Sequence, residues 1–335
     1  MAKAVLLVLF FAGAGAGQTH RLISNPRTVI WGYYDASTAP VLRVRSGDTV
    51  EIRSAMIASP EMLEGAGVRP ADVEPANREI HREVKERGPG PHVLTGPVYV
   101  EGAEPGDVLE VQIQKVELAL PYALNLFLPG EGALPEDFPY AKVKVFPLDA
   151  KSMMSRIAEG VEVPLLPFFG SMGVAPPIES GRISSAPPWV HAGNLDNKHL
   201  VAGTTLYIPV HARGALFSVG DAHAAQGDGE VDLAALETVL TGTFRLVVRK
   251  DMKLRWPRAE TPTHWMTMGF DEDLDLAMKI AVREMIDFLA AEKKLTRDDA
   301  YMLSSVAADF HVTQVVDGRK GVHGMIAKST FGKGK

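Results

Sequence analysis

Side chains of the types that bind metal ions are concentrated in two short segments between residues 191 and 230, HAGNLDNKH and GDAHAAQGDGE. Asp221 and His223 stand two positions apart where an apolar strand is expected to end, so in extended backbone both project from the same face. The Gly-Asp-Gly sequence that follows predicts a tight reversal, which would return Glu230 to the same place. Two carboxylates and one imidazole suit a Zn²⁺-type site with an open position for water.

Asn194 and Asp196 are also two positions apart, on an earlier loop, and could complete such a metal site or bind a substrate. Spacing alone leaves another interpretation open, with Asp221 as a turn residue, His223 as a satisfied surface histidine and Glu230 as a solvated strand end. That alternative accounts for each residue singly, but it does not account for their concentration in one part of the chain.

Other residues give weaker signals. His92, in the segment PGPHVLTGP, precedes an expected strand and is a candidate for the mouth of the site. Loop histidines are more often merely exposed, and this caution applies to His191 and His199. Tyr33, Tyr34 and Asp35, within WGYYDA, could line a pocket, although core packing is the commoner role of such aromatic residues. Four further histidines are interpreted as structural or surface residues: His211, His264, His311 and His323.

Two other kinds of chemistry find no support. The chain has no cysteine, which excludes disulfides and a thiolate nucleophile and leaves nitrogen and oxygen to hold any metal. A Ser nucleophile is not indicated either, because the sequence has no Gly-x-Ser-x-Gly turn.

The elements that must position these residues are mostly short strands. Apolar runs bounded by turn-forming residues predict strands within 28–55, 200–220 and 242–249. Residues 92–118, HVLTGPVYVEGAEPGDVLEVQIQKVEL, alternate on both sides of a Gly- and Pro-rich turn, and they predict a β-hairpin.

The rest of the chain divides into loops and helices. Residues 121–188 are punctuated by Pro and Gly with little periodicity, so we expect them to form loops over a β scaffold. Residues 271–294 have the spacing of an amphipathic helix. A second helix is expected to begin at Thr296, with Asp299 completing a capping pattern. Both helices are expected to cover the sheet.

Composition limits the class of protein. A chain of 335 residues that is 46% hydrophobic can bury a substantial core, which excludes disorder. Its net charge of -6 lacks the basic balance that nucleic-acid binding requires. Length alone allows two domains or one large domain with a helical appendage equally well. We take residues 18–335 as one β-rich α+β domain, with a strand-rich body at about 28–255 and a helical part at about 270–310.

The first residues, MAKAVLLVLFFAGAGAGQTH, have the shape of a secretory signal, with one lysine, a short apolar stretch and small residues. We expect residues 1–17 to be a signal peptide, with Ala14-Gly15-Ala16 as one possible cleavage site. The predicted location is therefore periplasmic or secreted. No later segment is long and apolar enough to cross a membrane.

Four blocks of this sequence resemble the acetamidase/formamidase family. In chain order they are WGYYDASTAPVLRVRSGDTVEI, HVLTGPVYVEGAEPGDVLEV, HAGNLDNKHLVAGTTLYIPVHARGALFSVGDAHAAQGDGEV and GFDEDLDLAMKIAVREMIDFL. The third is the most specific, because its Gly-Asn-x-Asp, Ile-Pro-Val, Gly-Asp-x-His and Gly-Asp-Gly-Glu sequences rarely occur together. The blocks fall within residues 28–320.

The resemblance implies a β-sandwich (jelly-roll-like) fold with flanking C-terminal helices, and hydrolysis of a short amide such as formamide or acetamide to the acid and ammonia. It also implies a divalent metal, with zinc favoured, and a homo-oligomer. The family pattern falls on the residues that spacing selects, with His92 in its HxLTGP block: Asn194, Asp196, Asp221, His223 and Glu230.

On this basis Asp196, Asp221 and His223 are expected to hold the ion, which would activate a water. Glu230 is expected to act as the base, although it could instead be a ligand, and Asn194 to stabilise the oxyanion. The chain departs from the family pattern at Ala192 and at Ala222, and also in its signal segment, so its substrate could differ.

Two alternatives remain at this stage. The same metal site could hydrolyse another small amide-like compound outside the cytoplasm. The chain could also be an exported, non-catalytic β-sandwich that binds a small ligand.

Overall fold

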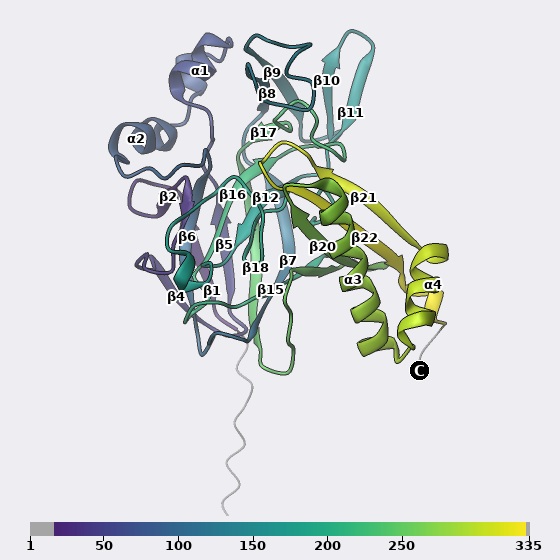
Figure 1. Ribbon diagram of the computed structural model, residues 1–335. Coiled ribbons are helices and arrows are strands. Elements are labelled where there is room, and N and C mark those ends of the chain that lie inside the picture. Colours follow the sequence, from purple (N-terminus) through teal and green to yellow (C-terminus); the bar gives the residue numbers. More distant parts are fainter. Residues whose placement is uncertain (1–16, 333–335) are drawn as a thin grey trace, which may run out of the picture.

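The computed structural model describes residues 17–332. Of the expected signal segment, residues 1–17, all but the last residue therefore lie outside the described residues. Two large sheets form the body, and two helices near the C-terminus cover part of one of them (Figure 1). No helix within 17–332 has both the length and the apolarity needed to cross a membrane.

The first sheet has nine strands, and its neighbours are antiparallel except for the parallel pair at one edge. In spatial order the strands are β1 (Thr19–Ile23), β5 (Thr49–Arg53), β18 (Leu240–Arg249), β7 (Val108–Leu118), β15 (Thr205–Pro209), β19 (Arg258–Glu260), β20 (His264–Asp271), β22 (Lys320–Ala327) and β21 (Ala308–Gln314).

The second sheet has eleven strands. Its main path is β11 (Val161–Pro164), β10 (Met154–Ala158), β9 (Lys142–Asp149), β8 (Tyr122–Phe127), β17 (Glu237–Thr238), β16 (Phe217–His223), β12 (Phe168–Gly173) and β14 (Ala192–Asn194). Its branch consists of β6 (Val93–Glu101), which pairs with β16, β2 (Val29–Trp31) and β4 (Leu42–Arg45). A separate pair joins β3 (Tyr33–Tyr34) to β13 (Ile183–Ser184).

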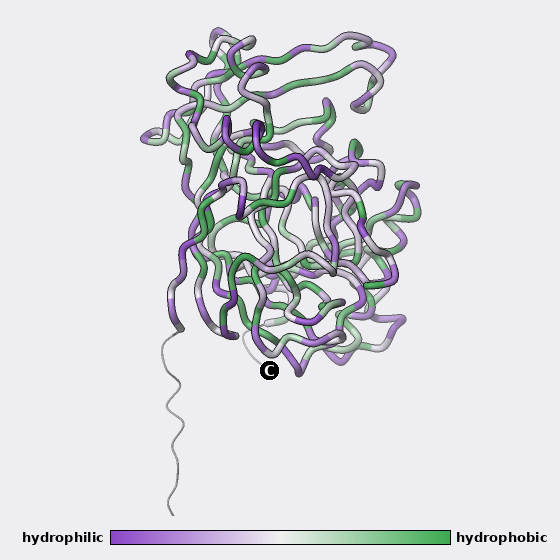
Figure 2. The backbone as a smooth tube through the Cα atoms, turned by 90° about the vertical axis from the view of Figure 1, so that its left-hand side faces the viewer, coloured by the Kyte–Doolittle hydropathy of each residue, from purple (hydrophilic) through white to green (hydrophobic). Residues whose placement is uncertain are grey.

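The main hydrophobic core lies between the two sheets. Phe244 on β18 packs against Phe169 on β12 and Phe217 on β16, with ring centroids 5.5 and 6.0 Å apart. All three rings are fully buried. The backbone tube in Figure 2 shows hydrophobic stretches in the interior, with hydrophilic colour at many of the outer chain reversals. Burial of alternate strand residues from both sheets therefore fixes the sandwich.

The helices lie at the periphery. The N-terminal half of the chain contains α1 (Pro60–Gly65), α2 (Pro75–Glu83) and the 3₁₀ turn η1 (Pro70–Asp72). Towards the C-terminus are α3 (Leu274–Lys293) and α4 (Arg297–Ala307), with the 3₁₀ turns η2 (Ile178–Ser180) and η3 (Lys328–Phe331) elsewhere on the chain. Helix α3 packs on β20 and β22, and Gly269 permits this close approach because a Cβ there would meet the carbonyl of Ala277.

Several sequence predictions are confirmed. The protein is β-rich with C-terminal helices, and α3 lies within the expected range. Helix α4 begins after Thr296, whose side chain accepts a hydrogen bond from the Asp299 N–H as the capping pattern predicts.

Two predictions about elements are wrong. The segment expected to be a hairpin forms β6 and β7, but these strands belong to different sheets, and the turn between them carries the chain from one sheet to the other. Residues 121–188 are not mainly loops, because they contain β8 to β12, which build much of the second sheet.

Candidate active site

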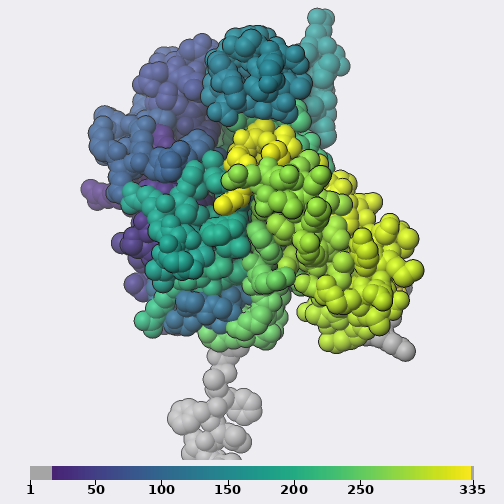
Figure 3. All heavy atoms as spheres, in the orientation of Figure 1, coloured from purple at the N-terminus to yellow at the C-terminus, as the bar shows by residue number. Residues whose placement is uncertain are grey.

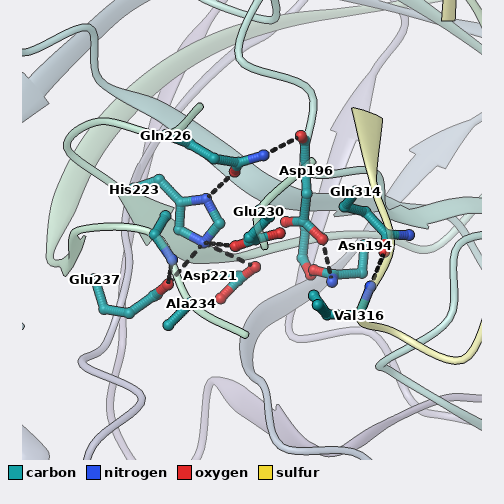
Figure 4. Close-up of polar contacts among 12 residues, drawn as sticks. Asn194, Asp196, Asp221, His223, Gln226, Glu230, Ala234, Glu237, Gln314 and Val316 are labelled. Atoms are coloured by element: carbon teal, nitrogen blue, oxygen red, sulfur yellow. Dashed lines mark hydrogen bonds and ion pairs between the residues drawn. The ribbon is translucent and has the colours of Figure 1, made fainter. Parts of the chain in front are cut away.

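The candidate residues meet at one end of the second sheet. Strand β16 carries Asp221 and His223, and β14 ends at Asn194, with Asp196 in the loop that follows. The loop after β16 brings Glu230 back towards the same point (Figure 4). All five side chains are buried. The structure thus brings together the residues that spacing singled out.

His223 is held by contacts on both ring nitrogens. Its Nδ1 donates to Gln226 Oε1 at 2.9 Å, and Gln226 in turn donates through Nε2 to the Asp196 carbonyl at 2.7 Å. Its Nε2 lies 3.2 Å from Asp221 Oδ2 and 3.1 Å from Glu237 Oε1. Because Gln226 fixes the ring orientation, Nε2 faces the carboxylates of Asp221 and Glu237, which makes it a candidate metal ligand.

Asn194 orients Asp196. The Asn194 amide donates to Asp196 Oδ2 at 2.5 Å and accepts from the Ser171 hydroxyl at 2.6 Å. One amide hydrogen of Asn194 is thereby used within the protein, and the second remains for another acceptor.

Gly170 makes room for the acidic side chains. The register of β12 and β16 places it opposite Asp221, and its carbonyl accepts from the N–H groups of Leu195 and Asp196 at 2.8 and 3.2 Å. A Cβ at this position would collide with carboxylate oxygens of Asp196 and Asp221. Glycine here leaves the space in which those two side chains and a small ligand can meet.

Two acidic residues of the cluster were not found from the sequence. Glu237, on β17, accepts from the Ala235 N–H at 2.9 Å and contacts His223. Asp317 comes from the loop between β21 and β22, and its ligand oxygen lies within 4.8 Å of those of Asp196 and Glu230. In the sequence, Asp317-Gly318 has the composition of an ordinary turn and Glu237 that of a solvated strand residue, so neither carried a signal.

The charge of the cluster is unbalanced. Among residues 17–332, its five carboxylates form ion pairs only with His92 and His223. Four carboxylate oxygens are buried without a hydrogen-bond partner: Asp196 Oδ1, Glu230 Oε2, Glu237 Oε2 and Asp317 Oδ2. Buried acids without partners are costly, so the donor set calls for a cation.

The pKa values reflect this crowding. Burial and the charges of nearby acids raise the pKa of Asp196 and of Glu230 well above their usual ranges. Burial also raises the pKa of Asp317 to about 6. For Asp221, burial opposes ionisation, but the charges of His223 and His92 outweigh it and lower the pKa. For His223, burial favours the neutral ring, but Glu237 and Asp221 raise the pKa well above its usual value.

These residues fit a divalent metal ion. Ligand atoms of three overlapping triplets lie within 4.8 Å of one another: Asp196, Asp221 and His223; His223, Glu230 and Glu237; Asp196, Glu230 and Asp317. Carboxylate oxygen and imidazole nitrogen are donors that Zn²⁺ and similar ions accept. A positive ion in this space would satisfy the carboxylate oxygens that lack partners.

His92 stands beside the cluster as expected. Its Nε2 is 3.8 Å from Asp221 Oδ1, while its Nδ1 lies 3.1 Å from both the carbonyl and the hydroxyl of Ser185. The ring is buried, so the interpretation of an exposed loop histidine is wrong for His92.

A cavity of about 380 Å³ opens onto the cluster, a volume within the range of small-molecule sites. Its polar part includes Asn194, Asp196, Asp221, Glu230, Glu237, Asp317 and His92. Its apolar wall includes Trp31, Ile57, Met62, Leu126, Leu128 and Leu233. Tyr33 and Tyr34 are buried in a separate hydrophobic cluster, as the core interpretation predicts.

Three acidic residues of the site have a left-handed backbone conformation. The φ angles are +45° at Asp196, +55° at Asp221 and +43° at Glu230. Non-glycine residues rarely adopt this conformation, and it commonly marks functional sites. The chain therefore bends sharply at each acid and directs the three side chains inwards.

The fold and the site together define a β-rich protein with a buried, acid-rich candidate metal centre at the floor of a cavity. The model of the acetamidase/formamidase family matches residues 82–181 and 178–327. The chain belongs to that family, which confirms the resemblance seen in its sequence.

Individual relatives agree with this assignment. The chain is 32% identical to an acetamidase of Bacillus halodurans of known structure, with a TM-score of 0.79 over 93% of this chain and 99% of that one. An acetamidase of Yersinia enterocolitica superposes with a TM-score of 0.81 at 29% identity, over 96% of each chain. A formamidase of Methylophilus methylotrophus is 26% identical over 68% of this chain and 73% of its own length. For two further curated relatives the match spans about half of their length, 52% and 54%.

Proposed function

We propose that this protein is a metal-dependent amidase that cleaves the C–N bond of a short linear amide, giving a carboxylate and ammonia. The observation that carries this proposal is the buried cluster of five carboxylates and two histidines that opens into the cavity. Family relatives named acetamidase and formamidase support the choice of reaction.

In this proposal Asp196, Asp221 and His223 hold a divalent ion, and Glu237 and Asp317 complete the charge balance around it. Zinc is the first candidate, because the donors combine imidazole nitrogen with carboxylate oxygen. A bound ion of this kind polarises a carbonyl group and lowers the pKa of water towards about 7.

The protein's own groups supply proton transfer and orientation. Glu230 has a raised pKa and an unpaired Oε2 facing the cluster, which suits it to take a proton from water and to deliver it to the departing nitrogen. The free hydrogen of the Asn194 amide is available to the developing oxyanion. His92, held by Ser185, is available to orient the substrate beside Asp221.

The apolar wall favours a second candidate substrate class. A cavity of about 380 Å³ exceeds what formamide or acetamide fills, and Trp31, Met62 and Leu126 are among the apolar residues that line it. An amide with a longer apolar acyl group would bury surface that the smallest amides leave exposed. We therefore place such amides beside formamide and acetamide in the first substrate panel.

The test is ammonia release from this panel, combined with elemental analysis of the purified protein. The proposal predicts bound divalent metal, turnover, loss of turnover with a chelator and recovery on adding Zn²⁺ back. Metal-free protein that still hydrolyses amides would overturn the mechanism. A protein that binds metal, loses stability with the chelator and turns over no amide would instead be the non-catalytic binding protein.

We also propose that the chain is exported, which the signal-like pattern of residues 1–17 supports. The mass of the protein recovered from the periplasm or the medium tests this proposal. A mature chain shortened near Ala16 would support it, and full-length protein retained in the cytoplasm would contradict it.

A further inference from the structure

A second group of residues of metal-ligand type lies outside the acid-rich cluster. That first cluster consists of Asp196, Asp221, His223, Glu230, Glu237 and Asp317. Ligand atoms of His199, Asp228 and His323 all lie within 4.8 Å of one another. His199 follows β14, Asp228 lies in the loop after β16, and His323 is on β22. His311, on the neighbouring β21, stacks on His323 with ring centroids 5.1 Å apart.

His323 shows the feature expected of a ligand that lacks its ion. The side chain has no exposed surface, and its Nδ1 lies 2.8 Å from the Thr313 hydroxyl. Its Nε2 is buried with no hydrogen-bond partner. A hydrogen bond from Nδ1 to Thr313 leaves the lone pair on Nε2, which is the arrangement of a metal-bound histidine.

Burial disfavours the charged form of two of these histidines. Burial lowers the pKa of His323 well below its usual value, and His199, His311 and Lys198 lower it further. Burial also lowers the pKa of His199. Neutral imidazole is the form that binds metal ions.

We propose that His199, Asp228 and His323 form a second metal site, suited to nitrogen-preferring transition ions such as Zn²⁺. Two imidazoles and one carboxylate leave a position for water or for His311, whose Nδ1 lies 3.7 Å from Asp228 Oδ2. This donor set is richer in nitrogen than the first cluster, so the two sites differ in chemistry.

The second site has a direct connection to Glu230. Asp228 lies two residues before it, and the intervening Gly229 donates its N–H to the Thr313 carbonyl at 3.0 Å. Thr313 is also the partner of His323. Glu230 lies in the short segment 228–230. An ion bound to Asp228 and His323 would therefore link this segment to strands β21 and β22.

Binding must displace one existing interaction. Lys198 Nζ lies 2.8 Å from Asp228 Oδ2, with both side chains partly exposed. An ion at this site and the Lys198 ammonium would therefore compete for the same carboxylate of Asp228. An exposed ion pair costs little to break, about 0–1 kcal/mol.

The experiment counts metal with Zn²⁺ alone as the probe. Chelator-stripped protein is dialysed against buffered free Zn²⁺, and bound zinc is measured for the wild type, His199→Gln and Asp228→Asn. We expect each variant to lose one equivalent, or to bind it more than about 100-fold more weakly, since even outer-shell changes cost about 10–100-fold. His20→Gln on β1, whose ring contacts Asp48 away from both clusters, is the matched control and should keep the full count.

The outcome is a difference between variants, so it does not depend on amide turnover or on occupancy of the first cluster. Equal zinc content in the wild type and both variants would overturn the second site. Lys198→Met gives an independent test in the opposite direction, because removing the competing ammonium should tighten Zn²⁺ binding a few-fold. Unchanged or weaker binding in Lys198→Met would count against Asp228 as a ligand.

Discussion

At the residue level, the acids of the first cluster carry two costs that a purely structural role would not explain. Asp196, Asp221 and Glu230 are buried, and each has left-handed backbone. Each such conformation costs about 1–3 kcal/mol. These costs are repaid if a cation binds among the side chains, because binding then stabilises the folded state.

A substitution of Glu230 tests whether this residue is the catalytic base or a metal ligand. Glu230→Gln keeps the shape but cannot accept a proton, so we expect turnover to fall by about 10²–10⁴-fold while the metal content stays unchanged. Parallel measurement of ammonia release and zinc content checks this. If the metal is lost with turnover, Glu230 is a ligand and the base must be sought elsewhere.

Gly170 tests the space that the acids share. Gly170→Ala would place a Cβ against the carboxylate oxygens of Asp196 and Asp221. We expect weaker metal binding and loss of activity. Gly65→Ala, at the end of α1 where a Cβ meets nothing within 4 Å, is the control and should behave as wild type. Full metal binding by Gly170→Ala would show that the cluster is not confined as described.

His191 makes stability depend on pH. It is buried, and burial together with the charges of His211 and Arg319 lowers its pKa to about 3. A folded pKa below the unfolded value of about 6.5 gives stability above pH 6.5 that is lost as the pH falls. Urea unfolding should show a loss of about 2 kcal/mol from this residue between pH 7 and pH 5. The difference between wild type and His191→Gln isolates it, and parallel pH profiles would contradict the assignment.

At the level of elements, the cavity wall is built by parts that lie far apart in the sequence. Met62 comes from α1 and Leu126 from β8, and both line the cavity. We expect Met62→Ala and Leu126→Ala to lower kcat/KM for longer amides by at least about fivefold, because apolar contacts distinguish acyl chains by about 1–3 kcal/mol per methylene. Acetamide should be little affected.

The measurement is the ratio of kcat/KM for the two substrates. Leu276→Ala, on the exposed side of α3, serves as the control. Equal losses for short and long amides would mean that the wall positions the catalytic groups instead of selecting the acyl chain.

The sequence predicted some elements well and others poorly, for physical reasons. Helix α3 was predictable because its apolar residues repeat with helical period over twenty residues, and α4 because Thr296 and Asp299 form a local cap. The hairpin prediction failed because alternation identifies strands but not their partners. β6 and β7 each pair with strands distant in the sequence, and only the packing of two sheets decides this.

The candidate site, like the fold, was only partly predictable from the sequence. Asp221, His223 and Glu230 lie close together in the sequence, so their spacing was informative. Glu237 and Asp317 are brought in by β17 and by the loop after β21, and neither has a local signal. Long-range pairing therefore supplies the part of the site that sequence spacing could not.

At the level of the whole molecule, the candidate site depends on both sheets. His223 and Asp221 come from the second sheet, whereas Asp317 comes from the loop between two strands of the first. Strand β21, which precedes this loop, also pairs with Gly229 through an isolated β-bridge between Gly229 and Gln314. Relative placement of the two sheets is thus a condition for assembling the candidate site as well as for core packing.

The outer surface suggests where copies of the chain would meet. Helices α3 and α4 form a lobe that projects from the body in Figure 3. On α4, Tyr301, Met302 and Val306 are 62%, 68% and 82% exposed, although all three are large and hydrophobic. Met302 and Val306 are four residues apart and so share a helix face. Exposed apolar faces of this kind are typical of protein interfaces. If the chain forms the homo-oligomer that the family resemblance implies, we expect this face at its contact.

The prediction concerns assembly in solution. We expect the wild type to be oligomeric by light scattering, because a stable interface buries more than about 1,000 Å² and an apolar helix face can supply its centre. Met302→Lys combined with Val306→Lys should dissociate it without lowering the helix content. Leu276→Lys makes the same chemical change at an exposed position of α3 and should leave assembly intact. A monomeric wild type would contradict assembly itself. An oligomer that survives both α4 changes would instead place the contact on another face.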